Sequence, residues 1–509
     1  MLKRIICLLL AFIMLLGLLV GCKKDEESSS ENDETSVSTV SDDSEENKDD
    51  IQRLDGVNYG GKDIIVSVRG DDSSITELGT ESKGDLLSEV LYERTVTTQE
   101  RIGVKVKLNI GNVWSSYNKT VAEIRNSVGS QMQAYDIVAG WSYRILPLTL
   151  EGLFQDLNTT KYYDSDDDWW SKTVSDALTV NGKIYMNTGD IAASYMDACC
   201  AIAINDTVAK EFKYEYDNFY DIVYSGEWTI EYLDQIVKNV YKDENGNQIR
   251  DDQDTFGYVG WYSDADAFWA ACNINIIDNN GEDRPTLSFN VDKIQGAVDK
   301  IYKLFYENTG VEVLREGVTE GQTYEDPLDH FQKDRSMFTF VALGNLSILA
   351  SMKSTYGVLP MPKYDKAQEN YGTYLFNSMS LWGIPVDSKD MDMSSAVLTS
   401  MGYDSRELVI ETHYETLLKT RYVKDSTSGF MIDIIYNNVY MNFDSMFNEA
   451  LAASTSGADR LNTPVMILRR SNTTTNTGKF NAQAWWASNE IGYTERFNNL
   501  VDGYFNLSN

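Results

Sequence analysis

Residues 63–70 are Asp63-Ile64-Ile65-Val66-Ser67-Val68-Arg69-Gly70, an apolar run closed by a glycine that predicts a buried strand. Apolar residues then recur at helical spacing from residue 85 to residue 101, and Gly103 ends this predicted helix. The same alternation continues through a strand at 104–110, a helix at 121–132 and a strand at 135–140. This order of strands and helices predicts a mostly parallel sheet with helices on both faces.

The alternation persists along the rest of the chain. Further strands are expected at 201–204, 337–341 and 356–362, an extended stretch at 377–385, and helices at 228–240, capped by Thr229, and at 293–306. A chain of 509 residues is too long for one ordinary core. We therefore predict an α/β protein with two lobes, one formed by 56–195 plus 372–420 and the other by 196–371 plus 421–509.

The first residues predict export. Lys3 and Arg4 precede an apolar run that ends at Val20, which is shorter than the roughly 20 residues of a membrane span and typical of a secretory signal. The run ends in Leu19-Val20-Gly21-Cys22, which resembles the lipobox of bacterial lipoproteins. The alternatives are a plain signal peptide or an anchor helix with an incidental cysteine. We expect 1–21 to be removed and Cys22 to be lipidated, so that lipid anchors the protein to the cell membrane outside the cytoplasm.

An acidic linker follows Cys22. Residues 23–50 hold many Asp, Glu and Ser and no aromatic residue, so they cannot bury enough apolar surface to fold. We assign 22–55 to the lipidated cysteine and this disordered linker.

Charge and cysteine content exclude several functions. The net charge of −34 argues against nucleic acid as a partner. Cys199, Cys200 and Cys272 do not form a disulfide framework and are expected to be buried free thiols. With His330 and His413 as the two histidines, zinc sites and Ser-His-Asp catalysis are poorly supported. No short motif places paired carboxylates across a cleft or forms a phosphate loop, so we expect no enzyme.

Several stretches, in this order, resemble the extracellular solute-binding lipoproteins of ABC importers, family 1, a class with many sugar binders. They are Asp136-Ile137-Val138 with Gly152-Leu153-Phe154-Gln155-Asp156-Leu157, then 203–206, 226–233, 331–338 and 356–363. Asp334 stands where the family pattern has glycine. Residues 85–94, 168–170 and 414–419 resemble a large-bodied subgroup of these lipoproteins.

The resemblance implies a periplasmic-binding-protein-like fold, in which a hinge of crossing segments joins two α/β lobes and the ligand binds in the cleft between them. It also implies the extracellular substrate-binding component of an ABC transporter, which delivers its ligand to permease subunits. We expect a monomer that binds a carbohydrate, specifically an oligosaccharide. The alternatives are a peptide-binding transport lipoprotein, a surface-anchored glycoside hydrolase, or a sensor subunit that presents ligand to a receptor.

Candidate ligand-binding residues follow from the chemistry of sugars. Sugar rings present flat C–H faces and rims of hydroxyls, so a binder needs aromatic faces together with carboxylates or amides. Open α/β sheets place ligands beyond the carboxyl ends of their strands. This rule selects Arg69, Trp141 and Tyr143, and it extends to Trp261, Asn345 and Trp382, which follow other extended segments. Asp190 is added because it follows Thr188-Gly189 just before the expected first crossing between the lobes. For any one aromatic residue, packing in the core is the alternative.

A candidate calcium loop lies at 243–254. Its oxygen-bearing side chains have the spacing of a calcium-binding loop, with Asp243, Asn245, Asn247, Asp251 and Asp254 as the tentative ligands. Gln248 replaces the usual glycine, and Asp254 is shorter than the usual bidentate glutamate. The alternative is an acidic hairpin turn without metal. We expect no other cofactor.

Overall fold

The computed structural model describes residues 51–70, 77–79, 81, 84–281, 283–315, 326–376, 379–452, 464–469 and 480–507. The described residues belong to one compact unit, Asp49–Asn509. The signal peptide, Cys22 and the linker up to residue 50 lie outside the described residues, so their assignments stay predictions. In the described part of the chain, no helix combines the length and the apolar character needed to cross a membrane.

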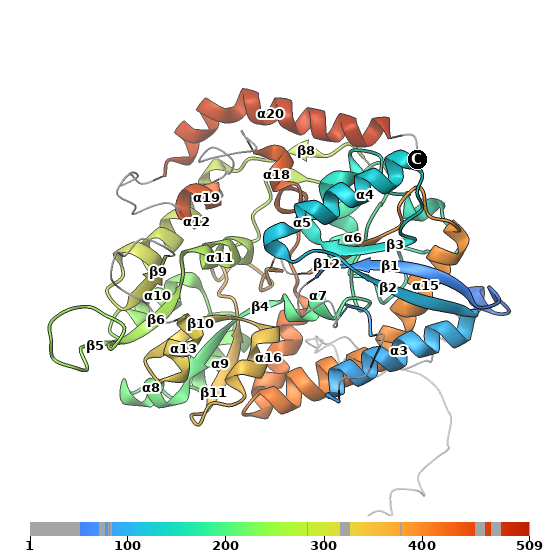
Figure 1. The fold of residues 1–509 in the computed structure, drawn as a ribbon. Coiled ribbons are helices and arrows are strands. Elements are labelled where there is room, and N and C mark those ends of the chain that lie inside the picture. The colour runs from blue at the N-terminus through green and yellow to red at the C-terminus, as the bar shows by residue number, and fades with distance from the viewer. Residues whose placement is uncertain are drawn as a thin grey trace, which may run out of the picture. The chain divides into compact units, whose positions relative to one another are not determined.

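The first sheet confirms the alternation predicted for residues 63–140 (Figure 1). Its parallel strands are β1 (Lys62–Val68), β2 (Val104–Ile110) and β3 (Ile137–Trp141), and β12 (Ser380–Gly383) pairs antiparallel with β3. The strand order is β12-β3-β1-β2. Because β1, β2 and β3 run parallel, their carboxyl ends lie at one edge of the sheet.

Two helices connect the parallel strands of the first sheet, α3 (Leu86–Ile102) and α4 (Asn118–Ser130). Asp85 begins α3, because its side chain accepts a hydrogen bond from the backbone N–H of Ser88. Gly103 ends the helix in the left-handed conformation, with φ of 65°. Both signals were visible in the sequence.

The second sheet has the strand order β11-β4-β10-β6-β5, and β9 pairs with β6 outside this path. The strands are β4 (Cys200–Asn205), β5 (Tyr241–Lys242), β6 (Thr255–Trp261), β9 (Val311–Leu314), β10 (Ser336–Ala342) and β11 (Tyr356–Pro360). The sheet is mixed: β6 runs parallel to β9 and β10, whereas β4 runs antiparallel to β10 and β11. β4, β10 and β11 were predicted, and β5, β6 and β9 were not.

The helices that accompany the second sheet include α10 and α12, which the sequence predicted at 228–240 and 293–306. They are α8 (Asp206–Glu211), α9 (Asn218–Tyr224), α10 (Ile230–Val237), α11 (Ala265–Ala271), α12 (Val291–Tyr302) with its π-helical end η6 (Lys303–Glu307), α13 (Pro327–Gln332) and α14 (Leu346–Leu349). Thr229 caps α10 as predicted, because its side chain accepts a hydrogen bond from the backbone N–H of Tyr232. Trp228 is fully buried beside it and donates its indole N–H to the carbonyl of Pro360 at 2.8 Å.

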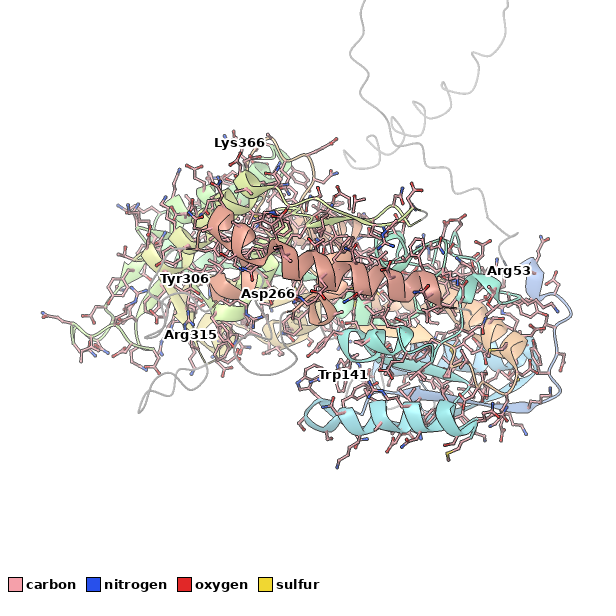
Figure 2. The ribbon with its side chains drawn as sticks, turned by 90° about the horizontal axis from the view of Figure 1, so that it is seen from above. Arg53, Trp141, Asp266, Tyr306, Arg315 and Lys366 are labelled. Carbon is pink, nitrogen blue, oxygen red and sulfur yellow. The ribbon has the colours of Figure 1, made fainter. Side chains whose placement is uncertain are left out.

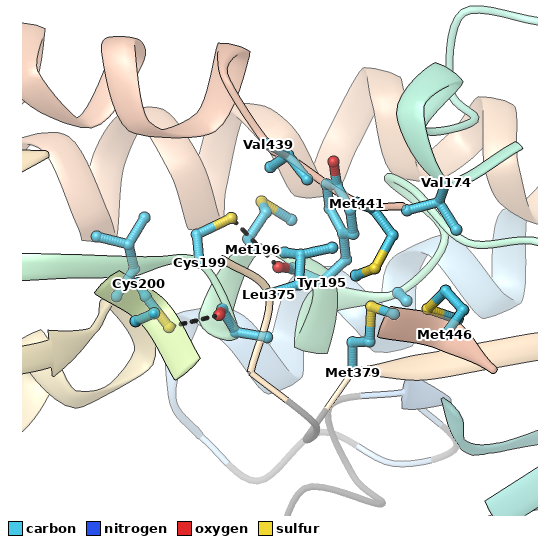
Figure 3. Packing of buried hydrophobic residues seen from close by; sticks show 14 of the residues in the cluster. Val174, Tyr195, Met196, Cys199, Cys200, Leu375, Met379, Val439, Met441 and Met446 are labelled. Atoms are coloured by element: carbon cyan, nitrogen blue, oxygen red, sulfur yellow. Dashed lines mark hydrogen bonds between the residues drawn. The ribbon is translucent and has the colours of Figure 1, made fainter. Parts of the chain in front are cut away.

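Three segments meet where the chain passes between the sheets. The first segment includes α7 (Ala193–Asp197) and leads into β4. An isolated bridge from Cys199 to Leu375 joins it to the second segment, and a bridge from Thr373 to Val439 joins the second segment to the third. Figure 3 shows this junction, which is packed with the side chains of Met196, Met379, Met441 and Met446 around Leu375 and Val439. The flexible thioether side chains of methionine fill irregular space between segments of different direction.

Free buried thiols are confirmed at the three predicted positions, Cys199, Cys200 and Cys272. The thiols of Cys199 and Cys200 donate to the carbonyls of Tyr195 and Ala198, both at 3.5 Å (Figure 3). Burial raises the pKa of each thiol. These groups are therefore packing residues in this structure.

The last part of the chain is helical. Its elements are α15 (Met391–Asp404), the π-helical run η8 (Ser405–Tyr422), α16 (Ser426–Asn437), α17 (Phe443–Met446), α18 (Asn448–Leu451), α19 (Pro464–Arg469) and α20 (Ala482–Asn506). α15 and η8 pack on α3, whereas α16 packs on β11. This region thus contacts elements of both sheets.

The long helix α20 also contacts residues from both predicted lobes. At its start, the N–H of Ala482 donates to the side chain of Gln295 in α12 at 2.8 Å. Near its end, the hydroxyl of Tyr504 lies 2.8 Å from that of Thr149, and Lys183 donates to the carbonyl of Leu507 at 2.6 Å. The strands of each sheet fall within one set of predicted lobe ranges, but the boundaries themselves stay a prediction.

Candidate ligand-binding site

An aromatic cluster lies at the carboxyl ends of β2 and β3. Trp141 is the last residue of β3, Tyr143 lies in the short helix α5 (Ser142–Ile145), and Trp114 begins the turn η2 (Trp114–Ser116) after β2. The ring of Trp114 meets those of Trp141 and Tyr143 edge to face, at centroid distances of 5.2 and 4.9 Å. Tyr117 meets Trp141 in the same way at 4.7 Å. We call Trp114, Tyr117, Trp141 and Tyr143 the aromatic cluster.

Exposure differs strongly within the aromatic cluster. Trp141 is 4% exposed and Tyr117 is 1% exposed, so both are packing residues in this structure, whereas Trp114 is 41% exposed. Tyr143 is partly buried. Trp114 and Tyr143 therefore present aromatic surface that a ligand can reach, held in place by the buried rings of Trp141 and Tyr117.

Two guanidinium groups contact the aromatic cluster. Arg69 follows β1, and its Cζ lies 5.6 Å from the ring centroid of Trp141. Arg144, the residue after Tyr143, places its Cζ 4.6 Å from the ring of Trp114 and 5.3 Å from that of Tyr143. Arg69 is fully buried, and its Nη2 lies 3.2 Å from Oε1 of the equally buried Glu77. Burial raises the pKa of Glu77, although the charge of Arg69 acts in the opposite direction.

A second group of side chains lies at the carboxyl ends of β6 and β9. These strands are parallel, with Trp261 opposite Leu314, so the residues that follow them, Tyr262 and Arg315, come together. The Cζ of Arg315 lies 5.5 Å from the ring of Tyr262 and 5.5 Å from that of Tyr306. The Cζ of Arg469 in α19 lies 5.2 Å from the ring of Tyr262. We call Tyr262, Asp266, Tyr306, Arg315 and Arg469 the arginine–tyrosine cluster.

Two carboxyl groups lie in or beside the arginine–tyrosine cluster. Asp266 accepts from Nη1 of Arg469 at 2.9 Å, and burial raises the pKa of Asp266 to about 6. Asp264 accepts from the hydroxyl of Tyr258 at 2.8 Å and from the N–H of Trp261 at 2.9 Å. Burial raises the pKa of Asp264 to about 7. Oδ1 of Asp266 has no hydrogen-bond partner among the described residues.

Tyr374 lies in a segment that crosses between the sheets, and its carbonyl accepts from the N–H of Cys200 at 3.0 Å. Burial raises the pKa of Tyr374, and the charge of Asp266 acts in the same direction. Figure 2 shows Asp266, Tyr306 and Arg315 near one another and Trp141 apart from them on the first sheet. Aromatic faces and charged groups from both sheets are thus available around one crossing segment.

The structure places the other predicted site residues in different surroundings. Trp261 is partly buried and packs on the small cluster of Phe256, Val259 and Leu314. Asn345 is exposed in the turn η7 (Leu343–Asn345) after β10. Trp382 is completely buried in β12.

Asp190 is 3% exposed and is held by structural contacts. It accepts from the hydroxyl of Tyr436 at 2.7 Å and from the guanidinium of Arg406 at 3.1 Å. Trp382 and Asp190 therefore present almost no surface to a ligand in this structure. No observation tests ligand contact at any of the seven positions, which stay predictions.

The candidate calcium loop is organised by its own hydrogen bonds. The carboxylate of Asp243 accepts from the N–H groups of Gly246 and Gln248, at 2.7 and 2.9 Å. Asn247 donates to Asp251 at 2.8 Å, and the buried Asp254 accepts from the hydroxyl of Tyr241 at 2.9 Å. Among the described residues, no group of three or more His, Cys, Asp or Glu side chains is placed to hold a metal. Calcium binding at this loop stays a prediction.

Sequence reasoning missed Trp114, Arg144, Tyr262, Arg315 and Arg469. Trp114 follows the predicted strand 104–110 within a few residues, so the strand-end rule could have selected it. Tyr262 and Arg315 follow strands that the sequence did not reveal. Arg469 lies far along the chain in α19, and no local pattern connects it with Asp266.

Comparison with known proteins identifies the fold. No protein-family model and no curated protein matches the sequence. An ABC substrate-binding protein from Listeria monocytogenes, solved with cycloalternan, aligns with a TM-score of 0.51 at 11% identity over 86% of this chain and 98% of its own. The GacH receptor of Streptomyces glaucescens, solved without ligand and with acarbose, gives the same four values. A family 1 extracellular solute-binding protein from Bifidobacterium longum subsp. infantis gives 0.50 at 11% identity, over 84% of this chain and 100% of its own.

These likenesses show that the chain has the α/β fold of periplasmic binding proteins. The fold predicted from the sequence is therefore confirmed, and the resemblance to family 1 solute-binding proteins is confirmed at the level of structure.

Proposed function

We propose that this protein is the extracellular substrate-binding component of an ABC transporter and captures a carbohydrate between the carboxyl ends of its two sheets. The observation that carries the proposal is the aromatic cluster, in which the 41% exposed ring of Trp114 lies edge to face with Tyr143 beside the guanidinium of Arg144. An exposed ring next to a hydrogen-bond donor is the chemistry that a sugar requires.

The arginine–tyrosine cluster supplies the opposite side of the proposed site. Tyr262 provides a ring, and Asp266 provides a carboxylate whose Oδ1 has no hydrogen-bond partner among the described residues. We propose that one ligand contacts both clusters, which favours an oligosaccharide over a single sugar.

Closure about the crossing segments is the proposed mechanism. The sheets are joined by segments that meet at the methionine-rich junction of Figure 3, and such segments can act as a hinge. A ligand that contacts both clusters binds the closed arrangement more tightly than the open one and so shifts the protein toward closure. The closed form then delivers its ligand to the permease.

The known structures support carbohydrate as the ligand class. The Listeria monocytogenes protein was solved with cycloalternan, and the Streptomyces glaucescens receptor with acarbose. We extend this class to the present chain, together with tethering of the protein to the membrane through lipid at Cys22. We further propose that it acts as a monomer and as a binder, not an enzyme.

A melting-temperature screen tests the proposal. The compact unit Asp49–Asn509 is heated with a panel of mono- and oligosaccharides and with short peptides. A ligand that binds only the folded state adds about 2.7 kcal/mol at 100 times its dissociation constant, enough for a clear shift. We expect a shift with one class of oligosaccharide. A shift with peptides alone, or hydrolysis of a glycan in the same samples, would overturn the proposal.

A further inference from the structure

Two guanidinium groups, those of Arg69 and Arg144, contact the aromatic cluster, although the chain carries a net charge of −34. Residues 101–122 and 137–150, which include β2, η2, β3 and α5, contain no Asp or Glu. The same segments carry Lys105, Lys107, Lys119 and Arg144. These two segments are therefore free of negative charge, whereas Glu77 pairs with the buried Arg69 beside Trp141.

Arg144 is held by aromatic rings and an amide oxygen. Its guanidinium lies over Trp114 and Tyr143, it is partly buried, and its hydrogen bond is to Oδ1 of Asn118 at 3.4 Å. Among the described residues, no carboxylate lies within ion-pair distance of it, and its Nε is buried without a hydrogen-bond partner. By contrast, Arg125 pairs with Glu151 at 2.6 Å.

Two further arginines of the same chain have carboxylate partners, whereas the fully buried Arg94 donates to the carbonyls of Ile191 and Glu77. Arg250 pairs with Glu312 at 2.6 Å and Arg406 pairs with Asp190 at 3.1 Å. In a chain so rich in acidic residues, a partly buried arginine that lacks a carboxylate partner is a ready site for an anion.

We propose that the carbohydrate bound at the aromatic cluster carries an anionic substituent, a carboxylate or a sulfate, which pairs with Arg144. A guanidinium offers a planar fork of N–H donors that matches two oxygens of such a group, and burial against rings strengthens the pair. The ring that bears the substituent would lie against Trp114 or Tyr143. This inference rests on the proposed function and names the substrate class within it.

The arginine–tyrosine cluster adds positive charge on the other sheet. Arg315 lies between the rings of Tyr262 and Tyr306, at the carboxyl end of β9. Arg469 pairs with Asp266 at 2.9 Å, so Arg315 is the guanidinium that this cluster offers to a ligand. A longer acidic oligosaccharide would therefore meet a guanidinium on each sheet.

The test uses carbohydrates that differ in charge alone. Calorimetric titrations of Asp49–Asn509 compare short oligogalacturonates with their methyl esters, and sulfated oligosaccharides with their desulfated forms, alongside neutral oligosaccharides. We expect one acidic class to bind about tenfold or more tightly than its uncharged counterpart, as is typical of a charged hydrogen-bonded pair. The class that binds distinguishes carboxylate from sulfate.

Variants of Arg144 locate the effect. Arg144→Gln is expected to remove the preference, so that the acidic and the uncharged form bind with nearly equal affinity, and Arg144→Lys to keep part of the preference. Arg125→Gln, which changes an arginine that already has a carboxylate partner, is the matched control and should bind as the parent does. Melting curves without ligand show that each variant is folded, and Arg144→Lys serves if Arg144→Gln is not.

Each outcome decides the inference. Equal or tighter binding of the uncharged sugars, or a charge preference that survives Arg144→Gln, would overturn the assignment of Arg144 while carbohydrate binding itself still supports the proposed function. Binding of no carbohydrate, charged or neutral, would overturn both.

Discussion

The buried ion pair between Arg69 and Glu77 provides a quantitative test of how the edge of the first sheet is built. Nη2 of Arg69 lies 3.2 Å from Oε1 of Glu77, and the two side chains are 1% and 0% exposed. The hydroxyl of Ser380 in β12 donates to the same carboxylate at 2.9 Å. In Glu77→Ala the guanidinium stays buried beside Trp141 without this carboxylate.

The expected cost of Glu77→Ala is about 3–5 kcal/mol in the free energy of unfolding, the range found when one member of a buried pair is removed. The exposed pair of Arg125 and Glu151, at 2.6 Å and with side chains 47% and 40% exposed, is the matched control. Glu151→Ala should cost about 0.2–1 kcal/mol, because water and salt already screen that pair.

A double variant separates the charge from the packing. Burial raises the pKa of Glu77 even though Arg69 and the hydroxyls of Ser194 and Ser380 lower it, so the intact pair contributes little net stability. Replacement of both partners, Arg69→Met with Glu77→Leu, should therefore cost much less than the sum of the two single replacements.

Urea unfolding at neutral pH measures these costs. The midpoints and slopes of curves followed by circular dichroism give the free energies, and tryptophan fluorescence shows whether one transition accounts for both signals. The reasoning is refuted if Glu77→Ala costs no more than Glu151→Ala, or if the double variant loses the full sum of the single variants.

Three further predictions concern buried or acidic groups. Burial raises the pKa of Asp264 from 3.8 to about 7. The folded state therefore holds this proton more tightly than the unfolded state does. The free energy of unfolding should fall as pH rises between these two values, by up to about 1.4 kcal/mol per pH unit. Asp264→Asn should weaken this loss in melting curves recorded against pH, and an unchanged loss would contradict it. Cys199, Cys200 and Cys272 are buried with raised pKa values, so a thiol reagent should label them after denaturation and not before, and fast labelling of folded protein would oppose this view. Calorimetric titration of calcium into chelator-treated protein should give binding heat, and Asp243→Asn should abolish this heat. If the parent protein gives no heat, the calcium prediction is wrong.

The fold of the first sheet was predictable because its signals are local. The helix α3 begins with the cap at Asp85 and ends at Gly103, and β1, β2 and β3 are short runs of buried or alternating apolar residues. The strand β6 was missed because Gly257 and Gly260 interrupt its pattern. A Cβ on Gly257 would lie 2.6 Å from Cβ of Val237, so close packing against α10 requires the glycine, and this contact is not visible in the sequence.

The candidate site was predictable in part for the same reason. The strand-end rule selected Arg69, Trp141 and Tyr143: in the structure Trp141 and Tyr143 meet the exposed ring of Trp114, and Arg69 contacts Trp141. It also selected Asp190, whose guanidinium partner, Arg406, lies 216 residues away in the chain. Partners at such separations depend on tertiary contacts, and spacing along the chain carries no signal for them.

Binding of a carbohydrate at the aromatic cluster is the central claim, and titration calorimetry of a Trp114 variant tests it most directly. The parent unit Asp49–Asn509 should bind the oligosaccharide found in the melting screen at one site per chain, and Trp114→Ala should weaken binding about tenfold or more, as expected when an aromatic contact in a binding site is truncated. Tyr224→Ala, which removes a 57% exposed ring from α9, should change nothing. A carbohydrate that binds Trp114→Ala as tightly as the parent would contradict the claim.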